Sequence, residues 1–324
     1  MRAILNFAFG EPTQTLELVD LPEPNAPEEG EVLVGMEFAP INGNDLLVVK
    51  GLFAFKPQLP AVAGNEGVAK VLAIGSGVTN VRVGDRVLPP LYGSTWAERL
   101  IIPAKGLFAL PDNVDPQQLA MLRINPPTAA LLLSQFVDLQ PGDWVIQNAA
   151  NSGVGRAVIA IAKSRGLKTV NLVRRPELLE ELKASGADVV LLDEPGSAEK
   201  AAELVGNGNV RLAIDGISGI AGASLIHYLS PGATLVTYAL MSGEFTVPVN
   251  VMDTIFKRIT VRGFFQSHPQ YDALIPDALK GAAQLLADGQ LHAPVAAVYP
   301  MSAIKEAVAH AERGGKVLLD LQAG

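Results

Sequence analysis

The sequence contains no cysteine and only four histidines among its 324 residues. The absence of cysteine excludes thiolate catalysis, disulfide bonds and every zinc site with a cysteine ligand. The histidines, at positions 227, 268, 292 and 310, are far apart and lack the short spacings of a metal-binding pair on a helix. We therefore expect them to be surface or core residues.

Positive charge is also scarce. The chain has 25 lysines and arginines against 33 aspartates and glutamates, a formal net charge of −8, and no basic block. This balance argues against nucleic acid or an anionic membrane as a partner. No apolar run reaches the roughly 18 residues of a membrane span, and the first residues lack a signal-peptide pattern. We expect a soluble, cytoplasmic protein that acts on a small molecule.

Hydrophobic residues make up 49% of the chain, enough for a large core. Residues 1–121 contain short Val- and Leu-rich runs separated by Gly, Pro and Asp, which predicts a β-rich domain. Residues 122–265 alternate apolar strands with helices, a pattern typical of a doubly wound parallel sheet. Residues 266–324 return to helices and a short strand, KVLLDL. The fold class is therefore α/β.

The segment NAANSGVGRAV, residues 148–158, has the form of a dinucleotide-binding turn. Compared with G-x-G-x-x-G, Ala150 and Ser152 replace the first two glycines, and only Gly155 is kept. The turn follows a predicted strand and begins a helix, the context in which backbone N–H groups bind a pyrophosphate. Small residues permit that close approach. The alternative is an ordinary tight turn between a strand and a helix.

The residues about 20 positions further on distinguish the two dinucleotides. An NAD site has an acidic residue there, whereas this strand ends in NLVRRPE, with Arg174, Arg175 and no carboxylate before Glu177. Arginine binds phosphate well, so the sequence predicts NADPH. Alternatively, both arginines are solvated or pair with Glu177 and Glu180.

With a β-rich first domain and a central Rossmann unit, the chain resembles the medium-chain dehydrogenase/reductase superfamily. The resemblance implies a GroES-like catalytic domain over residues 1–121 and 266–324 and a Rossmann NADP-binding domain over residues 122–265. In zinc alcohol dehydrogenases of this superfamily, a Gly-His-Glu stretch and an upstream cysteine hold the metal. Here the matching stretch is Gly64-Asn65-Glu66, and the upstream segment is INGNDLL. The resemblance is therefore to the zinc-free branch.

Within that branch, the segment from NPPTAALLL to KTVNLVRR is most similar to the NADPH-dependent trans-2-enoyl-thioester reductases of the mitochondrial type, followed by the quinone oxidoreductases. The similarity implies a homodimer in which the strand ITVRGFF pairs across a two-fold axis. It also implies a set of cofactor-binding residues: Asn151, Ser152, Gly153 and Val154 at the pyrophosphate, Arg174 at the 2′-phosphate, and Tyr238, Met241, Phe264 and Phe265 at the nicotinamide, with Thr128 and Lys316 nearby.

The chain departs from that family at one catalytic position. The family carries a tyrosine in the stretch matching KGLFAFKP, where its hydroxyl polarises the thioester or protonates the product. Here the aligned residue is Phe53, and Phe55 offers no hydroxyl either. Asn42, Tyr92 or a ribose hydroxyl could hold the substrate carbonyl instead. Tyr92 is a candidate proton donor, with a packing role as the alternative and water as the slightly preferred proton source.

We therefore expect an NADPH-dependent, metal-free reductase of activated C=C bonds, of the 2-enoyl thioester or enone type. Hydride would go to the β-carbon and a proton to the α-carbon. One alternative is an NADPH:quinone oxidoreductase, whose acceptor needs less help from a protein acid. The other is a cofactor-binding protein without significant turnover, which the missing tyrosine favours.

Overall fold

The computed structural model describes residues 1–323 and divides them into two units. Unit 1 contains Met1–Ile124 together with the chain from Ala293 onward, and unit 2 contains Asn125–His292. The chain thus leaves unit 1, builds all of unit 2 and returns to unit 1. None of the helices described for residues 1–323 has the length and apolarity needed to cross a membrane.

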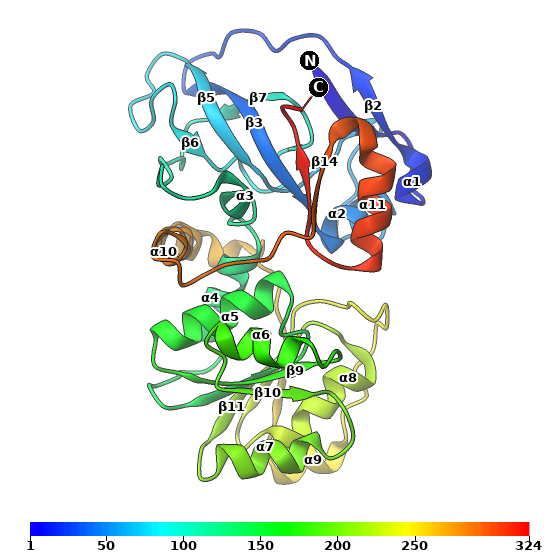
Figure 1. Cartoon of the computed structure of the whole chain (residues 1–324), viewed down its shortest axis with the longest axis vertical. Helices are drawn as coiled ribbons and strands as arrows, with labels where there is room; N and C mark the ends of the chain where they lie inside the picture. Colours follow the sequence, from blue (N-terminus) through cyan, green and yellow to red (C-terminus); the bar gives the residue numbers. More distant parts are fainter. Residues whose placement is uncertain (324) are drawn as a thin grey trace. The chain divides into compact units, whose positions relative to one another are not determined.

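Unit 1 is built on antiparallel strands around β3, the longest strand of the chain (Figure 1). One sheet has the order β2-β1-β4; the other has the order β14-β15-β3-β5-β6, with β7 also paired to β3. Strand β15 runs antiparallel to β3, and β14 is parallel to β15. The strands are β1 (Arg2–Asn6), β2 (Leu16–Asp20), β3 (Glu31–Ile41), β4 (Ala61–Val62), β5 (Val68–Ile74), β6 (Arg86–Val87), β7 (Arg99–Pro103), β14 (Ala297–Pro300) and β15 (Val317–Asp320).

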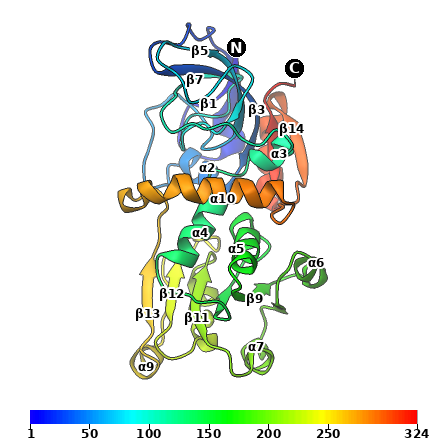
Figure 2. The ribbon, with the colours of Figure 1, turned by 90° about the vertical axis from the view of Figure 1, so that its left-hand side faces the viewer.

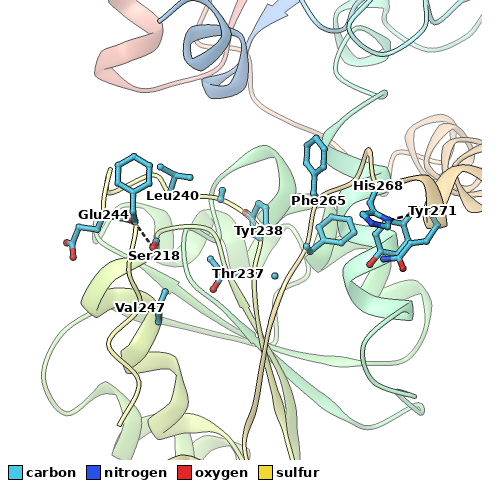
Figure 3. A pocket seen from close by; sticks show the side chains of 14 residues that line it. Ser218, Thr237, Tyr238, Leu240, Glu244, Val247, Phe265, His268 and Tyr271 are labelled. Carbon is cyan, nitrogen blue, oxygen red and sulfur yellow. Dashed lines mark hydrogen bonds between the residues drawn. The ribbon is translucent and has the colours of Figure 1, made fainter. Parts of the chain in front are cut away.

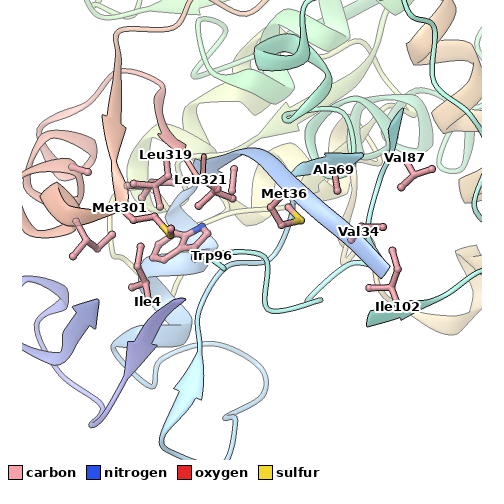
Figure 4. Packing of buried hydrophobic residues seen from close by; sticks show 14 of the residues in the cluster. Ile4, Val34, Met36, Ala69, Val87, Trp96, Ile102, Met301, Leu319 and Leu321 are labelled. Atoms are coloured by element: carbon pink, nitrogen blue, oxygen red, sulfur yellow. The ribbon is translucent and has the colours of Figure 1, made fainter. Parts of the chain in front are cut away.

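The core of unit 1 follows from alternation along β3. Val32, Val34 and Met36 are buried, while the residues between them are partly exposed, as expected for a strand with one face on a core. Figure 4 shows Val34 and Met36 in one cluster with Ile4 and the fully buried Trp96, and Val32 belongs to the same cluster. The helices of unit 1 are short except for the last: α1 (Pro12–Thr15), α2 (Gly43–Val49), α3 (Pro116–Leu119), η3 (Met301–Ala303) and α11 (Ile304–Arg313).

Unit 2 contains a six-stranded parallel sheet with the order β10-β9-β8-β11-β12-β13 (Figure 2). This is the doubly wound sheet that the alternating pattern predicts. Its strands are β8 (Trp144–Gln147), β9 (Lys168–Val173), β10 (Val189–Leu192), β11 (Val210–Asp215), β12 (Thr234–Thr237) and β13 (Thr260–Gly263). Its helices are α4 (Asn125–Ser134), α5 (Gly153–Ser164), α6 (Leu178–Ala184), α7 (Ser197–Val205), α8 (Gly219–Ser224), η1 (Leu225–Tyr228), α9 (Val251–Phe256), η2 (Pro269–Leu274) and α10 (Ile275–Ala287).

Both faces of this parallel sheet are covered by helices. Val145 on β8 belongs to a cluster with residues of α4, α5 and α10, whereas its neighbour Ile146 belongs to a cluster with residues of α7 and η1. On β11, likewise, Leu212 belongs to the first of these clusters and Ala213 to the second. Because successive side chains point to opposite faces, strands buried on both sides become continuous apolar runs.

The second domain boundary lies later than the sequence predicts. Residues 266–292, which we assigned to the β-rich domain, belong to unit 2. Tyr271 of η2 and Leu291 are buried in the same cluster as residues of α4 and α5, and Leu285 and Leu286 of α10 pack against it. The boundaries are therefore Ile124/Asn125 and His292/Ala293.

Candidate cofactor and substrate site

The glycine-rich turn joins β8 to α5, and its substitutions have a structural reason. Ser152 is the N-cap of α5, and its Oγ accepts a hydrogen bond from the N–H of Gly155 over 3.1 Å. A Cβ at Gly155 would lie 2.4 Å from the carbonyl oxygen of Ala150. A Cβ at Gly153 would lie 2.6 Å from the side-chain nitrogen of Asn125. The turn therefore leaves no room for larger residues at these glycines, and the first turn of α5 offers N–H groups suited to a pyrophosphate.

A buried carboxylate, which the sequence analysis missed, organises the loops beside this turn. Asp215 ends β11 and accepts hydrogen bonds from Asn148 Nδ2 over 2.8 Å and from Thr237 Oγ1 over 3.0 Å. It also accepts from the backbone N–H groups of Ile217 and Ser218, each over 2.9 Å. These bonds connect the carboxyl ends of β8, β11 and β12, where parallel sheets bind their ligands. The sequence signal that could have identified Asp215 is the polar residue that stands at the end of each predicted apolar strand.

Tyr238 follows β12 and lies against the turn. Its phenol forms a hydrogen bond with the side chain of Ser152, and burial raises its pKa to about 12. A Cβ at Gly216 would come within 2.6 Å of the Tyr238 hydroxyl oxygen, so Gly216 makes room for this ring. The phenol is therefore protonated at neutral pH. The structure thus brings the predicted residues Ser152 and Tyr238 together.

A pocket of about 520 Å³ lies at the carboxyl ends of β12 and β13 (Figure 3). The predicted residues Tyr238, Phe264 and Phe265 line it. Phe265 is 43% exposed, whereas Phe264 is buried and packs edge-on against Phe136, with 5.9 Å between ring centroids. Phe264 therefore belongs mainly to the core. Leu240, within the predicted stretch from Tyr238 to Met241, lines it too. The sequence analysis did not select five further lining residues, namely Ser218, Glu244, Val247, His268 and Tyr271.

The other two predicted residues near the nicotinamide differ in burial. Thr128, on α4, is buried and its hydroxyl donates to Gln266 Oε1 over 3.0 Å. Met241 is exposed, and its backbone N–H donates to the carbonyl of Gly216 over 3.1 Å. Thr128 is thus fixed by a buried contact, while the side chain of Met241 is available to a ligand.

The two arginines after β9 have different surroundings. Arg175 Nε lies 3.6 Å from Glu177 Oε1. This contact fits the alternative interpretation of the segment, in which the arginines are solvated or pair with glutamates. Arg174 is exposed at the end of β9. Burial raises the pKa of Asp193, at the end of the adjacent strand β10, and the Arg174 charge opposes that rise. The charge of Arg174 thus acts on Asp193 of the neighbouring strand, whereas Arg175 approaches Glu177.

In unit 1, the predicted residues Asn42 and Lys316 form one buried polar cluster with Glu66 and Asp45. Lys316 Nζ donates to Asn42 Oδ1 over 2.6 Å, and Asn42 Nδ2 donates to Glu66 Oε1 over 2.7 Å. Asp45 accepts from the backbone N–H of Asn42 over 2.7 Å. Both ends of the Asn42 amide are thus engaged inside unit 1. The predicted roles of Asn42 toward a substrate carbonyl and of Lys316 toward the cofactor remain predictions.

The charges in this cluster are perturbed by burial. Burial raises the pKa of Glu66 to about 7, although the charge of Lys316 and hydrogen bonds oppose the rise. Burial likewise raises the pKa of Asp45 to about 7, helped by the negative charge of Glu66. The pKa of Lys316 is lowered by its own burial, and that of Arg123 is lowered for the same reason. The pKa values of both carboxyl groups therefore lie near neutral pH.

Three aromatic rings of unit 1 form a group of their own. The ring of Phe53 lies 5.4 Å from that of Phe55 and 5.9 Å from that of Tyr92, and the rings of Phe55 and Tyr92 are 4.8 Å apart. Tyr92 has a positive φ of 62°. The structure thus places the phenol of Tyr92 next to the position that lacks a hydroxyl.

Asn65, which stands at the position of the zinc-ligand histidine, is buried. Its backbone N–H donates to Asp45 Oδ1 over 2.9 Å, and its side-chain nitrogen has no hydrogen-bond partner among residues 1–323. Across the same residues, no group of three His, Cys, Asp or Glu side chains is arranged to hold a metal ion.

Two protein families match the chain. Residues 28–112 match the alcohol dehydrogenase GroES-like domain, and residues 153–288 match the zinc-binding dehydrogenase family. The first match lies in unit 1 and the second in unit 2.

Comparison with individual relatives identifies the family more specifically. The chain is 38% identical to the mitochondrial enoyl-[acyl-carrier-protein] reductase of Rattus norvegicus and 39% identical to that of Homo sapiens. Each alignment covers 95% of this chain and 84% of the relative. Among solved structures, a mutant enoyl thioester reductase from Candida tropicalis matches with a TM-score of 0.88 and 25% identity, over 98% of this chain and 99% of the other. A Bacillus thuringiensis protein assigned as an NADPH:quinone reductase matches with a TM-score of 0.87 and 28% identity, over 98% of both chains. The chain belongs to the medium-chain dehydrogenase/reductase superfamily and, within it, to the family of the mitochondrial-type enoyl-[acyl-carrier-protein] reductases.

Proposed function

We propose that the protein is an NADPH-dependent reductase of the C=C bond of 2-enoyl thioesters and works without a metal. One observation carries the proposal: the capped N-terminus of α5 at Ser152, followed by Arg174 at the end of the next strand, matches the needs of a dinucleotide with a 2′-phosphate. The relatives support the reaction, since those at 38–39% identity are named as enoyl reductases. A structure at 25% identity and a TM-score of 0.89 is described as a complex of Etr1p with NADP and crotonyl-CoA.

The residues of unit 2 suit this cofactor. The N–H groups at the start of α5 would bind its pyrophosphate, Arg174 its 2′-phosphate, and the pocket beside Tyr238 and Phe265 its nicotinamide end. When bound, NADPH supplies a hydride. For a 2-enoyl thioester, the β-carbon would accept this hydride and the α-carbon would accept a proton.

A substrate panel tests the proposal. Purified protein is assayed with NADPH or NADH against crotonyl-CoA, a short enone and a naphthoquinone. We expect the highest kcat/KM for the pair of NADPH and crotonyl-CoA. Turnover of the naphthoquinone without turnover of crotonyl-CoA would refute the thioester assignment.

A quinone reductase is the second candidate, and Phe53 favours it. A quinone accepts electrons without a protein group that polarises a thioester carbonyl, so a chain without the family tyrosine could still reduce it. The similarity to the assigned NADPH:quinone reductase from Bacillus thuringiensis supports the same alternative.

We also propose that the protein forms a homodimer through β13. This strand is at the end of the sheet order, and all four of its residues are exposed. The neighbouring helix α9 has no buried residue and presents apolar side chains, among them Val251 and Phe256, the latter 72% exposed. An unpaired strand edge beside apolar surface favours pairing with another chain. A second copy of the chain is the proposed partner; a related structure is described as the Etr1p/Etr2p heterodimer from Candida tropicalis.

A further inference from the structure

We propose that Asp193 is a specificity-determining residue that lowers the preference of the protein for NADPH over NADH. The proposal rests on the proposed binding of the 2′-phosphate by Arg174 and adds a second residue to that site. The two dinucleotides differ only in this phosphate, so a charge beside it changes their relative affinity. Specificity of this kind depends on repulsive contacts as much as on attractive ones.

The first observation is the position of Asp193 in the sheet. Strands β9 and β10 are parallel, and Val173 is paired with Leu192. The backbone N–H of Asp193 donates to the carbonyl of Val173 over 2.8 Å, so the ladder of hydrogen bonds continues past this pair. Arg174 and Asp193 are the residues that directly follow it. They therefore lie side by side at the carboxyl edge of the sheet, where doubly wound sheets bind their ligands.

The second observation is the electrostatic interaction between these two residues. Arg174 is exposed, whereas Asp193 is half-buried. Burial raises the pKa of the Asp193 carboxyl, and the charge of Arg174 opposes that rise. Because the attraction between two charges is mutual, the carboxylate also offsets part of the positive charge that a phosphate would meet at Arg174.

The third observation concerns the neighbours of the pair. The hydroxyl of Tyr228, which the charge of Asp193 also reaches, shares a hydrogen bond with Ser197 Oγ. The other cation of the segment, Arg175, approaches Glu177. Asp193 therefore acts on the arginine that directly follows β9 rather than on Arg175.

The size of the effect follows from the charges. A phosphate monoester carries about two negative charges at neutral pH, whereas NADH has a neutral hydroxyl at the same position. Near a protein surface, the repulsion between a carboxylate and a phosphate several ångströms apart corresponds to about three- to tenfold in a binding constant. The neutral hydroxyl is almost unaffected. Asp193 therefore lowers the ratio of NADPH to NADH affinity by about this factor.

Removing the charge of Asp193 tests the proposal. The dissociation constants of NADPH and NADH are measured by cofactor fluorescence for the wild type and for Asp193→Asn, which keeps the shape of the side chain. We expect NADPH to bind about three- to tenfold more tightly and NADH to change by less than about twofold. Asp193→Ser should give the same shift. The gain should be smaller at about 0.5 M salt than at about 0.05 M, because salt screens a repulsion but does not alter a local rearrangement.

Two further variants serve as controls. Asp193→Glu keeps the charge and should keep the wild-type ratio of affinities. Glu203→Gln removes a charge from an exposed position near the end of α7 and should leave the ratio unchanged.

Two results would overturn the proposal. One is a ratio of NADPH to NADH affinity that stays the same or falls in both Asp193→Asn and Asp193→Ser. The other is a loss of NADH affinity at unchanged NADPH affinity, which would make Asp193 a ligand of the ribose hydroxyl. The proposed function fails in a different way: Arg174→Ala would then leave the ratio unchanged, which would remove the 2′-phosphate site itself.

Discussion

Lys316 Nζ donates a hydrogen bond to Asn42 Oδ1 over 2.6 Å and so joins two parts of unit 1 that are 274 positions apart in sequence. Asn42 in turn donates a hydrogen bond to Glu66, which also accepts one from the backbone N–H of Ile124 over 3.0 Å. The ammonium group of Lys316 also interacts electrostatically with two buried carboxyl groups, those of Glu66 and Asp45. Such a cluster is destabilised when its ionic balance changes, since buried charges without partners are costly.

We expect the stability of the protein to fall as the pH rises from about 4.5 to 7. The folded state raises the pKa of Glu66 to about 7, so in this range it retains a proton that the unfolded chain has released. Glu66→Gln removes this linkage and should reduce the loss of unfolding free energy between pH 5 and pH 7 by about 1–3 kcal/mol. Urea denaturation at the two pH values measures it.

The exposed variant Glu177→Gln serves as the control and should leave the pH dependence unchanged. In the Glu66 variant the pKa of Asp45 loses the contribution of the Glu66 charge but is still raised by burial, so a reduced slope remains. An identical slope in wild type and Glu66→Gln would contradict the account of this cluster.

Arg174→Ala should weaken NADPH binding by about 1.5–3 kcal/mol, the contribution of a charge-assisted hydrogen bond. Binding of NADH, which lacks the 2′-phosphate, should hardly change. Arg175→Ala is the matched control, because Arg175 already approaches Glu177 and should matter less. Titration calorimetry with both dinucleotides gives the comparison. Equal losses for NADPH and NADH would show that Arg174 has a structural role.

Gly155→Ala should weaken NADPH and NADH alike, since its Cβ would lie 2.4 Å from the carbonyl oxygen of Ala150 and displace the turn. We expect a loss of about 1–3 kcal/mol in unfolding free energy as well. Gly281→Ala, in the middle of α10 with no atom within 4 Å of the new Cβ, should instead stabilise by about 0.5–1 kcal/mol. Unchanged dinucleotide affinity in Gly155→Ala would contradict the assignment of the turn.

Val261→Asp should convert a dimer into a monomer, because it places a charge on β13, where the second copy would pair. Leu204→Asp, at an exposed apolar position of α7, is the control and should leave the assembly intact. Light scattering at micromolar concentration reports the mass. A monomeric wild type would refute the proposed dimer.

The parts of the fold that depend on local pattern were predictable. The turn at residues 148–158 was identified because a strand, small residues and a helix follow one another in sequence, and Ser152 is indeed placed at the start of α5. The parallel sheet was predicted because apolar strands alternate with helices along residues 122–265. These features need only neighbouring residues.

Features that depend on contacts between residues far apart in sequence were not predictable. Asp215 has no neighbour in sequence that indicates its bond to Asn148, and the burial of Leu291 against α4 and α5 moves the domain boundary to His292. The pairing of Phe53 with Tyr92 likewise results from the fold, since 39 residues separate them. The sequence showed that a hydroxyl was missing but did not place the candidate replacement.

The most direct test of the central claim follows the hydride itself. Wild-type protein is incubated with crotonyl-CoA and NADPH that carries deuterium at both positions of C4 of the nicotinamide, and the product is analysed by mass spectrometry and NMR. The account predicts butyryl-CoA with deuterium on the β-carbon and a solvent proton on the α-carbon. Oxidation of NADPH without deuterium on the β-carbon, or no butyryl-CoA at all, would contradict it.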